Sequence, residues 1–159
     1  MAARFFYLLL VNIVLISVAQ AKAVSESDKQ IKCLALNIYF ESRGEPMNGQ
    51  FAVAAVTMNR VKSEKFPSTV CKVVWQRRQF SWTHDGKSDR PKDVKAWAQA
   101  TTLAKLVYSK YLAFQAENDD AWDITQGALH YYAASLVQPY WAKEIIASTS
   151  IGRHTFVKL

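Results

Sequence analysis

The sequence has few residues of the types that bind metal ions. It contains two cysteines and three histidines, and the histidines, His84, His130 and His154, lie far apart in the chain. It has neither a C-x-x-C pair nor an H-E-x-x-H segment, the spacings that are typical of zinc sites. We therefore expect no metal ion and no other cofactor.

Glycine and proline are also scarce, with five and four residues among 159, and we find no internal repeat and no low-complexity tract. Half of the residues are hydrophobic and 13% are aromatic. A chain of this length and composition can bury one good core but has little room for a second. We therefore expect a single folded domain.

The N-terminus has the pattern of an export signal. Arg4 precedes an apolar run over residues 5–18, and Ala19-Gln20-Ala21 offers a small-residue cleavage site. We predict a signal peptide over 1–21, a polar leader over 22–29 and the folded domain over 30–159. A retained membrane anchor is the alternative, since the run is almost long enough to span a bilayer. With cleavage, membrane contact is transient, and we expect the protein in the periplasm or cell envelope.

Acidic residues are outnumbered, with 13 Asp and Glu against 20 Lys and Arg, which gives a net charge of +7. The charge is concentrated only at Arg77-Arg78 and over residues 87–110. An exported protein rarely meets nucleic acid, so we expect none as a partner and favour an anionic extracellular polymer or surface. The alternative is that these lysines lie on ordinary solvent-exposed faces of helices.

The two cysteines, Cys33 and Cys71, both lie in the exported part of the chain. In an oxidising compartment they can form a disulfide, and closing a loop of this length stabilises a protein by about 4 kcal/mol in the chain-entropy model. Two buried free thiols on apolar helix faces are the alternative. The sequence alone does not decide between them.

Helical patterns dominate the first part of the domain. Over residues 28–40, apolar side chains recur at i, i+3, i+4 and i+7, which predicts an amphipathic helix. Residues 50–65 are apolar nearly all round, which indicates a central buried helix, and Asn59 within it needs a hydrogen-bonding partner. The loop between the two helices is marked by Gly44, Pro46 and Gly49.

A short helix is predicted over residues 67–75, followed by a strand or extended cleft loop over residues 79–86. A long helix then begins at a cap formed by Ser88 or Asp89 and ends before Asn118. The residues predicted on its packed face are Val94, Trp97, Ala98, Thr101, Ala104, Val107, Tyr108 and Tyr111.

The C-terminal part changes character. Residues 127–133 are aromatic and extended in pattern, residues 139–141 form a turn, and residues 145–157 predict a hairpin that turns through Ser150-Ile151-Gly152. The predicted fold class is therefore α+β, mainly helical with a small antiparallel sheet toward the C-terminus. Lysozyme-like folds belong to this class.

Glu41 is the strongest candidate for a catalytic residue. It follows Ile38, Tyr39 and Phe40 at the end of the first predicted helix, so burial would favour its neutral form. A carboxyl group that stays protonated near neutral pH can donate a proton, as cleavage of a glycosidic bond requires. Arg43 would oppose this effect if it pointed inward, and an ordinary surface glutamate is the alternative.

Other side chains could complete a site. Glu45, Asp85 and Asp123 are the candidates for a second carboxylate, although their spacing gives none of them geometric support, and a salt bridge to Arg43 or a backbone cap is the simpler role for Glu45. Aromatic residues can stack on sugar rings where they are exposed, although we expect at least half of them in the core. These aromatic residues are Phe80, Trp82, Tyr131, Tyr132, Tyr140 and Trp141.

Several motifs in order resemble the SleB-type cell wall hydrolase family, which includes spore cortex-lytic enzymes. They are Tyr-Phe-Glu-Ser-Arg-Gly-Glu-Pro at 39–46, the segment at 49–61, Gln-Phe-Ser-Trp at 79–82 with Asp-Gly at 85–86, His-Tyr-Tyr at 130–132, Pro-Tyr-Trp at 139–141, and Ile-Gly-Arg-His-Thr-Phe at 151–156. The resemblance covers residues 31–158. Ser42, Arg153 and Val157 depart from the residues that are more usual in the family.

The resemblance implies a lysozyme-like fold that cleaves the bond between N-acetylmuramic acid and N-acetylglucosamine in peptidoglycan, as a lytic transglycosylase or a muramidase. It places Glu41 at the position of the catalytic glutamate. It also implies that a set of motif residues binds or shapes the glycan cleft: Arg43, Glu45, Gln50, Asn59, Gln79, Phe80, Ser81, His130, Tyr131, Tyr132 and His154. We add Trp141 to this set. The lack of a supported second carboxylate favours transglycosylation.

Two alternatives of a different class remain open. One is a zinc-dependent amidase or peptidase of the same polymer, built from His130, His154 and a carboxylate. The other is a non-catalytic wall-binding module whose aromatic residues bind glycan. In each case we expect a monomer whose partner is peptidoglycan.

Overall fold

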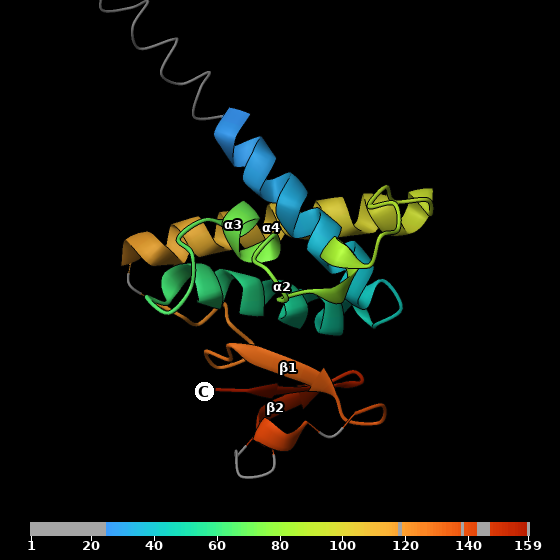
Figure 1. Ribbon diagram of the computed structural model, residues 1–159. Helices are drawn as coiled ribbons and strands as arrows, with labels where there is room; N and C mark the ends of the chain where they lie inside the picture. The colour runs from blue at the N-terminus through green and yellow to red at the C-terminus, as the bar shows by residue number, and fades with distance from the viewer. Residues whose placement is uncertain (1–24, 118, 138, 143–146, 159) are drawn as a thin grey trace, which may run out of the picture.

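The computed structural model describes residues 25–117, 119–137, 139–142 and 147–158. The predicted signal peptide lies outside these residues, as do the start of the leader and the first two residues of the predicted hairpin. The described chain forms a group of helices and a small C-terminal sheet (Figure 1), so the predicted α+β class is confirmed. None of its described helices is both long and apolar enough to cross a membrane.

A helix over residues 25–42, which we call the leading helix, brings Glu41 to its last turn. Leu34, Ala35 and Ile38 are fully buried on its packed face, as the predicted periodicity requires. The disulfide between Cys33 and Cys71 ties this helix to the short helix α3 (Val70–Val74). The structure therefore contains the disulfide, one of the two alternatives that the sequence left open.

The central helix α2 spans Met47–Lys62. The carbonyl of Pro46 accepts its first helical hydrogen bond from the Gln50 amide at 3.0 Å. The helix therefore begins three residues earlier than predicted, and Gly49 lies in its first turn rather than in the loop. The sequence pattern assigns Pro46 to the loop. Proline is nevertheless favoured at the start of a helix, where its missing amide costs nothing. At the other end, Ser63 adopts an extended conformation and stops the helix before Lys65.

Residues 79–86 contain the 3-10 helix η1 (Ser81–His84), so the predicted strand or extended loop was wrong. The amide and the hydroxyl of Thr83 both donate to the Phe80 carbonyl, at 3.3 and 2.8 Å, and close a tight turn. Phe80 and Trp82 are both buried. The alternation that suggested a strand therefore reflects two aromatic side chains of one turn that pack inward.

Helix α4 spans Val94–Glu117. Its cap is Asp93, whose carboxylate accepts a first-turn amide at 2.9 Å, rather than the predicted Ser88 or Asp89. Val94 and Ala98 are exposed, so their predicted burial was wrong. The buried residues of α4 are Ala100, Leu103, Ala104, Val107 and Tyr111.

The sheet has three antiparallel strands in the order β1-β3-β2. They are β1 (His130–Ala133), β2 (Ala147–Ile151) and β3 (His154–Val157), with the short 3-10 helix η2 (Tyr140–Ala142) between β1 and β2. The predicted extended segment and the C-terminal hairpin are thus confirmed. The turn of the hairpin contains Gly152 at a φ of +61°.

Helix α2 lies between the other helices and the sheet (Figure 1), and it contacts α3 and α4 on one side and β1 and β2 on the other. Ala52, Val53 and Val56 face Phe156 of β3 in a small cluster on the sheet side. The larger cluster joins α2 to the leading helix and α4. Burial on both sides explains why the sequence of α2 is apolar nearly all round.

Candidate active site

Glu41 lines a cavity of about 280 Å³ between the leading helix, α2, the segment before η1, and β1. The next residue, Ser42, is buried, and its hydroxyl donates to the Ile38 carbonyl at 2.9 Å within the last turn. The other lining residues are Arg60, Gln79, Phe80, His130 and Tyr131. Four of the predicted site residues, Gln79, Phe80, His130 and Tyr131, thus meet Glu41 here.

Burial raises the pKa of the Glu41 carboxyl above its ordinary value. Two neighbours partly offset the effect of burial on this pKa. The Tyr131 hydroxyl donates a hydrogen bond to Glu41 Oε2 at 3.0 Å, and the positive charge of Arg60 favours the ionised form. The net result is a carboxyl group that retains its proton more readily than a solvated glutamate and still has partners for its anion.

Arg60 is the residue of this site that the sequence analysis missed. It is 3% exposed, and its Nε donates to the Leu129 carbonyl at 2.7 Å, while its guanidinium lies 5.3 and 5.4 Å from the ring centres of Phe66 and Phe80. Its Nη1 has no hydrogen-bond partner among the described residues. The sequence did contain a signal for Arg60, which is a cation within an almost wholly apolar helix. A buried charge needs a nearby partner, so such a residue is a candidate for a site.

Tyr131 and His130 stand on strand β1 beside Glu41. Burial and the adjacent carboxylate raise the pKa of Tyr131 well above its ordinary value, so its hydroxyl remains a hydrogen-bond donor at neutral pH. Burial, Arg60 and Lys65 lower the pKa of His130, which favours a neutral imidazole. The wall formed by β1 therefore supplies uncharged polar groups to the cavity.

Glu45 lies outside this cavity and is bound to the hairpin turn. The Arg153 amide donates to its Oε2 at 2.9 Å, and the Arg153 side chain pairs with its Oε1. Burial alone would raise the pKa of Glu45, but the two hydrogen bonds from Arg153 and the charges of His154 and Arg153 leave it lowered. The ion pair of Glu45 is thus with Arg153 rather than with Arg43.

Asn59 and Asp123 hold the loop that leads into β1. The Asn59 amide donates to the Asp123 carboxylate at 2.8 Å and to the Ala128 carbonyl at 3.1 Å, which are the partners that its place in α2 requires. The Asp123 carboxylate also accepts bonds from Thr125 and Gly127 at 2.6–2.8 Å. Asp123 is therefore fully engaged in structural bonds.

Other predicted site residues lie beside the cavity rather than in its lining. Gln50 is buried and donates to the Glu45 carbonyl at 2.9 Å. His154 packs edge-on against Tyr131, with ring centres 5.2 Å apart. Ser81 is exposed at the start of η1, and Tyr132 follows Tyr131 on β1. The side chain of Trp141 lies outside the described residues.

Arg43 is exposed, and its guanidinium lies 4.9 Å from the ring centre of Tyr39, while the charge that lowers the pKa of Glu41 is that of Arg60. Asp85, the remaining candidate for a second carboxylate, forms an ion pair with Lys87 at 3.6 Å and lines a neighbouring pocket. Glu41 is thus the only carboxylate that lines its cavity among the described residues.

Within the described ranges, no group of three or more His, Cys, Asp or Glu side chains is arranged to hold a metal ion. His130 and His154 lie in different surroundings, since His130 lines the Glu41 cavity whereas Nδ1 of His154 lies 3.9 Å from Glu45 Oε2. The alternative of a zinc site built from these two histidines therefore gains no support from their geometry.

The family model for cell wall hydrolases matches residues 44–157 of this chain. The chain belongs to the cell wall hydrolase family. Curated relatives in this family include the spore cortex-lytic enzyme of Bacillus cereus, which is 35% identical over 132 residues, and that of Bacillus subtilis strain 168, which is 29% identical over 130 residues. These alignments cover 83% and 82% of the chain but only 45% and 38% of the relatives. The chain thus spans less than half the length of these relatives.

Solved structures of the cell wall hydrolase family have the same fold. The catalytic domain of the Bacillus cereus SleB protein superposes with a TM-score of 0.64 at 32% identity, covering 84% of this chain and 91% of that domain. The catalytic domain of a germination-specific lytic transglycosylase, SleB from Bacillus anthracis, gives a TM-score of 0.63 at 32% identity, with 81% and 93% covered. The chain thus matches most of two solved structures that are described as catalytic domains.

Proposed function

We propose that this chain is a lytic transglycosylase that cleaves the glycosidic bond between N-acetylmuramic acid and N-acetylglucosamine, with Glu41 as its one acid-base group. The observation that carries the proposal is the setting of Glu41. Its carboxyl has a raised pKa and lines a cavity in which no other described carboxylate is present. The names of the structural and curated relatives support the same substrate.

The first step uses the protonated form of Glu41. Its carboxyl proton passes to the glycosidic oxygen, and the bond from that oxygen to the muramyl C1 breaks through an oxocarbenium-like state. Glu41 becomes an anion in this step. The Tyr131 hydroxyl at 3.0 Å and the charge of Arg60 stabilise that anion without preventing protonation in the resting enzyme.

The second step returns the proton. The Glu41 carboxylate takes the proton of the muramyl C6 hydroxyl, and the C6 oxygen forms a bond to C1, which closes a 1,6-anhydro ring. The carboxyl is then protonated again, so one group completes the cycle and no water is consumed.

The alternative product would come from hydrolysis, which ordinarily uses two carboxyl groups about 5–10 Å apart. The three candidates for a second carboxylate are engaged elsewhere: Glu45 with Arg153, Asp123 with its loop, and Asp85 with Lys87. This distribution favours transglycosylation over a muramidase reaction. Because peptidoglycan lies outside the cytoplasm, the proposed function implies a location in the periplasm or cell envelope, and the predicted export signal agrees with that location.

The proposal predicts that Glu41→Gln abolishes the release of muropeptides from purified sacculi. Loss of a general acid lowers the rate by about 10²–10⁴-fold. The amide is nearly the same size as the carboxyl, so circular dichroism should show an unchanged fold. Glu64→Gln is the matched control, since Glu64 is exposed just beyond the end of α2 and its replacement should leave full activity. A folded Glu41→Gln protein that releases muropeptides at the normal rate would overturn the assignment.

A further inference from the structure

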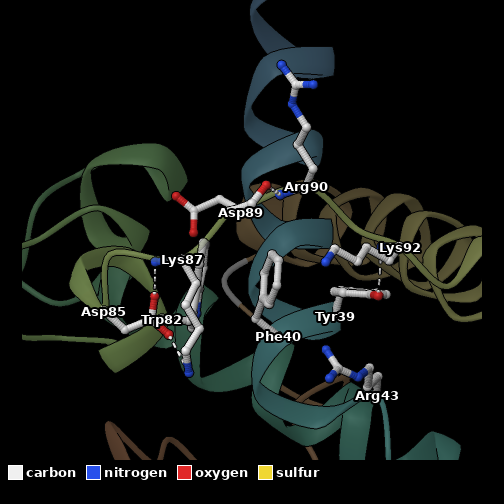
Figure 2. A pocket seen from close by; sticks show the side chains of 10 residues that line it. Tyr39, Phe40, Arg43, Trp82, Asp85, Lys87, Asp89, Arg90 and Lys92 are labelled. Atoms are coloured by element: carbon white, nitrogen blue, oxygen red, sulfur yellow. Dashed lines mark hydrogen bonds and ion pairs between the residues drawn. The ribbon is translucent and has the colours of Figure 1, made fainter.

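A second pocket, which we call the basic pocket, lies beside the leading helix and has a volume of about 490 Å³ (Figure 2). Tyr39, Phe40 and Trp82 provide its aromatic surfaces. Its charged lining comes from Arg43 and from the segment between η1 and α4, residues 85–92. The Glu41 mechanism does not use this pocket, and Arg43 is the one lining residue that the family resemblance assigns to the glycan cleft.

The charges in the basic pocket are unbalanced. Its lining contains four basic residues, Arg43, Lys87, Arg90 and Lys92, against two acidic ones, Asp85 and Asp89. Lys87 pairs with Asp85 at 3.6 Å. The other three cations form no ion pair within the described part of the chain. The pocket therefore has a net excess of two positive charges and offers three cationic groups to an anion.

The walls of this pocket are held in place before any ligand arrives. The Tyr39 hydroxyl accepts hydrogen bonds from the amides of Lys92 and Asp93 at 3.1 and 3.0 Å, which fixes the segment before α4 against the leading helix (Figure 2). Phe40 and Trp82 stack with ring centres 4.7 Å apart. A preorganised site loses less entropy when it binds a ligand.

The basic pocket adjoins the Glu41 cavity. Phe40 lines the pocket and the next residue of the same helix, Glu41, lines the cavity. In a second segment, Trp82 lines the pocket and Phe80, two residues before it, lines the cavity. The same two segments of the chain thus contribute residues to both the pocket and the cavity.

We propose that the basic pocket binds carboxylates of the peptide stem that is attached to the muramic acid next to the scissile bond. This inference rests on the proposed function. A peptide stem combines free carboxylates with aliphatic side chains, which match the arginine and lysine groups and the Phe40–Trp82 surface. Glycan from which an amidase has removed the stems lacks the stem carboxylates and keeps only the lactyl carboxylate on the muramic acid itself. The pocket would thus make the enzyme prefer strands that still carry peptides.

The test compares two substrates, peptidoglycan strands with intact stems and the same strands after an amidase has removed the stems. The variant Arg90→Gln/Lys92→Gln removes two pocket cations and leaves the Glu41 cavity unchanged. The matched control, Lys105→Gln/Lys110→Gln, removes two charges from α4 that lie about 16 and about 24 Å along the helix from its first residue, Val94, given a rise of 1.5 Å per residue. All proteins are compared with both substrates by KM and kcat.

We expect the pocket variant to raise KM by roughly fivefold to tenfold for strands with stems, in line with the loss of two exposed ion pairs. Its KM for bare strands should equal that of the unmodified enzyme, and the control variant should change neither. Equal KM values for pocket variant and unmodified enzyme on strands with stems would overturn the inference while the proposed function stands. An unmodified enzyme that cleaves neither substrate would instead refute the proposed function.

Phosphate groups of wall polymers are a second source of anions, and one further experiment distinguishes them from peptide stems. Sacculi stripped of phosphate-bearing wall polymers keep their peptide stems. The inference predicts that the difference in KM between the pocket variant and the unmodified enzyme persists on stripped sacculi. Its loss on stripping would assign the pocket to polymer phosphates and overturn the assignment to stems.

Discussion

At the scale of single residues, the proposed chemistry depends on how burial and two neighbouring side chains set the protonation of the Glu41 carboxyl. Burial favours the neutral Glu41, whereas Tyr131 and Arg60 favour its anion. A group that must donate a proton and then accept one works best when neither its neutral form nor its anion is strongly favoured. Tyr131 is the easier of the two neighbours to test, because phenylalanine preserves the ring and removes only the hydrogen bond.

Tyr131→Phe should move the alkaline limb of the pH–rate profile to higher pH. The hydrogen bond from Tyr131 lowers the pKa of Glu41, so its removal raises that pKa and keeps the general acid protonated over a wider range. The measurement is kcat/KM against pH on purified sacculi. Tyr108→Phe, on helix α4 and outside the lining of the Glu41 cavity, serves as the control. A limb that moves to lower pH in Tyr131→Phe would contradict the account.

Glu41 and Glu45 should affect stability in opposite directions. Glu41 has a raised pKa in the folded state, so between its unfolded and folded pKa values the native state binds more protons and stability falls as pH rises. Glu41→Gln should therefore be at least as stable as the unmodified protein at pH 7 and lose that advantage once the pH falls below the pKa that this carboxyl has in the unfolded chain. Thermal unfolding followed across this pH range checks the sign.

Glu45 has a lowered pKa, so its contribution to stability is present above its unfolded pKa and is lost as pH falls through the folded value. Glu45→Gln should destabilise the protein at pH 7 by about 1.5–3 kcal/mol, the usual worth of a hydrogen bond to a charged group. The deficit should disappear in acid. A Glu45→Gln protein with unchanged stability at pH 7 would contradict the role of the Arg153 pair.

At the scale of elements, the turn between β2 and β3 is fitted around Glu45. Gly152 has a φ of +61°, and a Cβ at this position would clash with Glu45 Oε2. Gly86 also has a positive φ, of +75°, but a Cβ there would meet no atom within 4 Å. A comparison of alanine substitutions at the two glycines therefore distinguishes the cost of backbone strain from the cost of losing the Glu45 contact.

Gly86→Ala should cost about 1–2 kcal/mol of unfolding free energy through backbone strain alone. Gly152→Ala should cost at least about 1.5 kcal/mol more, because it also displaces the buried carboxylate from Arg153. Denaturant unfolding of both variants provides the comparison. Equal losses in the two variants would show that Glu45 does not hold the hairpin.

The elements also show where sequence reasoning succeeds. The leading helix was predictable from its apolar periodicity, and α2 from a sequence that is apolar nearly all round, because the core that the helices enclose sets both patterns. The C-terminal strands were predictable from their aromatic and extended pattern. The conformation of residues 79–86 was not predictable from the alternation of aromatic and polar residues. There, the Thr83 hydroxyl donates to the Phe80 carbonyl and closes a tight turn in place of a strand. Boundaries at Pro46 and Asp93 were misplaced because both depend on a local cap rather than on periodicity.

The site shows a similar division. Glu41 could be found from sequence because it ends an apolar helix within an ordered set of motifs. Arg60 was missed because its partners, Leu129, Phe66 and Phe80, come from separate segments that meet only in the folded chain. Asn59 was placed among the substrate-binding residues, yet its amide hydrogens are occupied by the loop before β1.

At the scale of the whole molecule, one central helix separates a helical layer from a small sheet, and Glu41 lies where the two layers meet (Figure 1). The net charge of +7 suits an anionic wall polymer and is locally concentrated in the basic pocket beside this junction. The molecule thus brings an acid-base carboxyl and an anion-binding surface to neighbouring positions along one helix.

The most direct test of the central claim is the chemistry of the product. Purified sacculi are digested with the unmodified enzyme in water enriched in ¹⁸O, and the released muropeptides are analysed by mass spectrometry. If Glu41 acts alone and the muramyl C6 oxygen closes the ring, the products are 1,6-anhydromuropeptides without ¹⁸O. Reducing muropeptides that carry one ¹⁸O atom at C1 would instead show that water attacks, and would contradict the single-carboxylate mechanism.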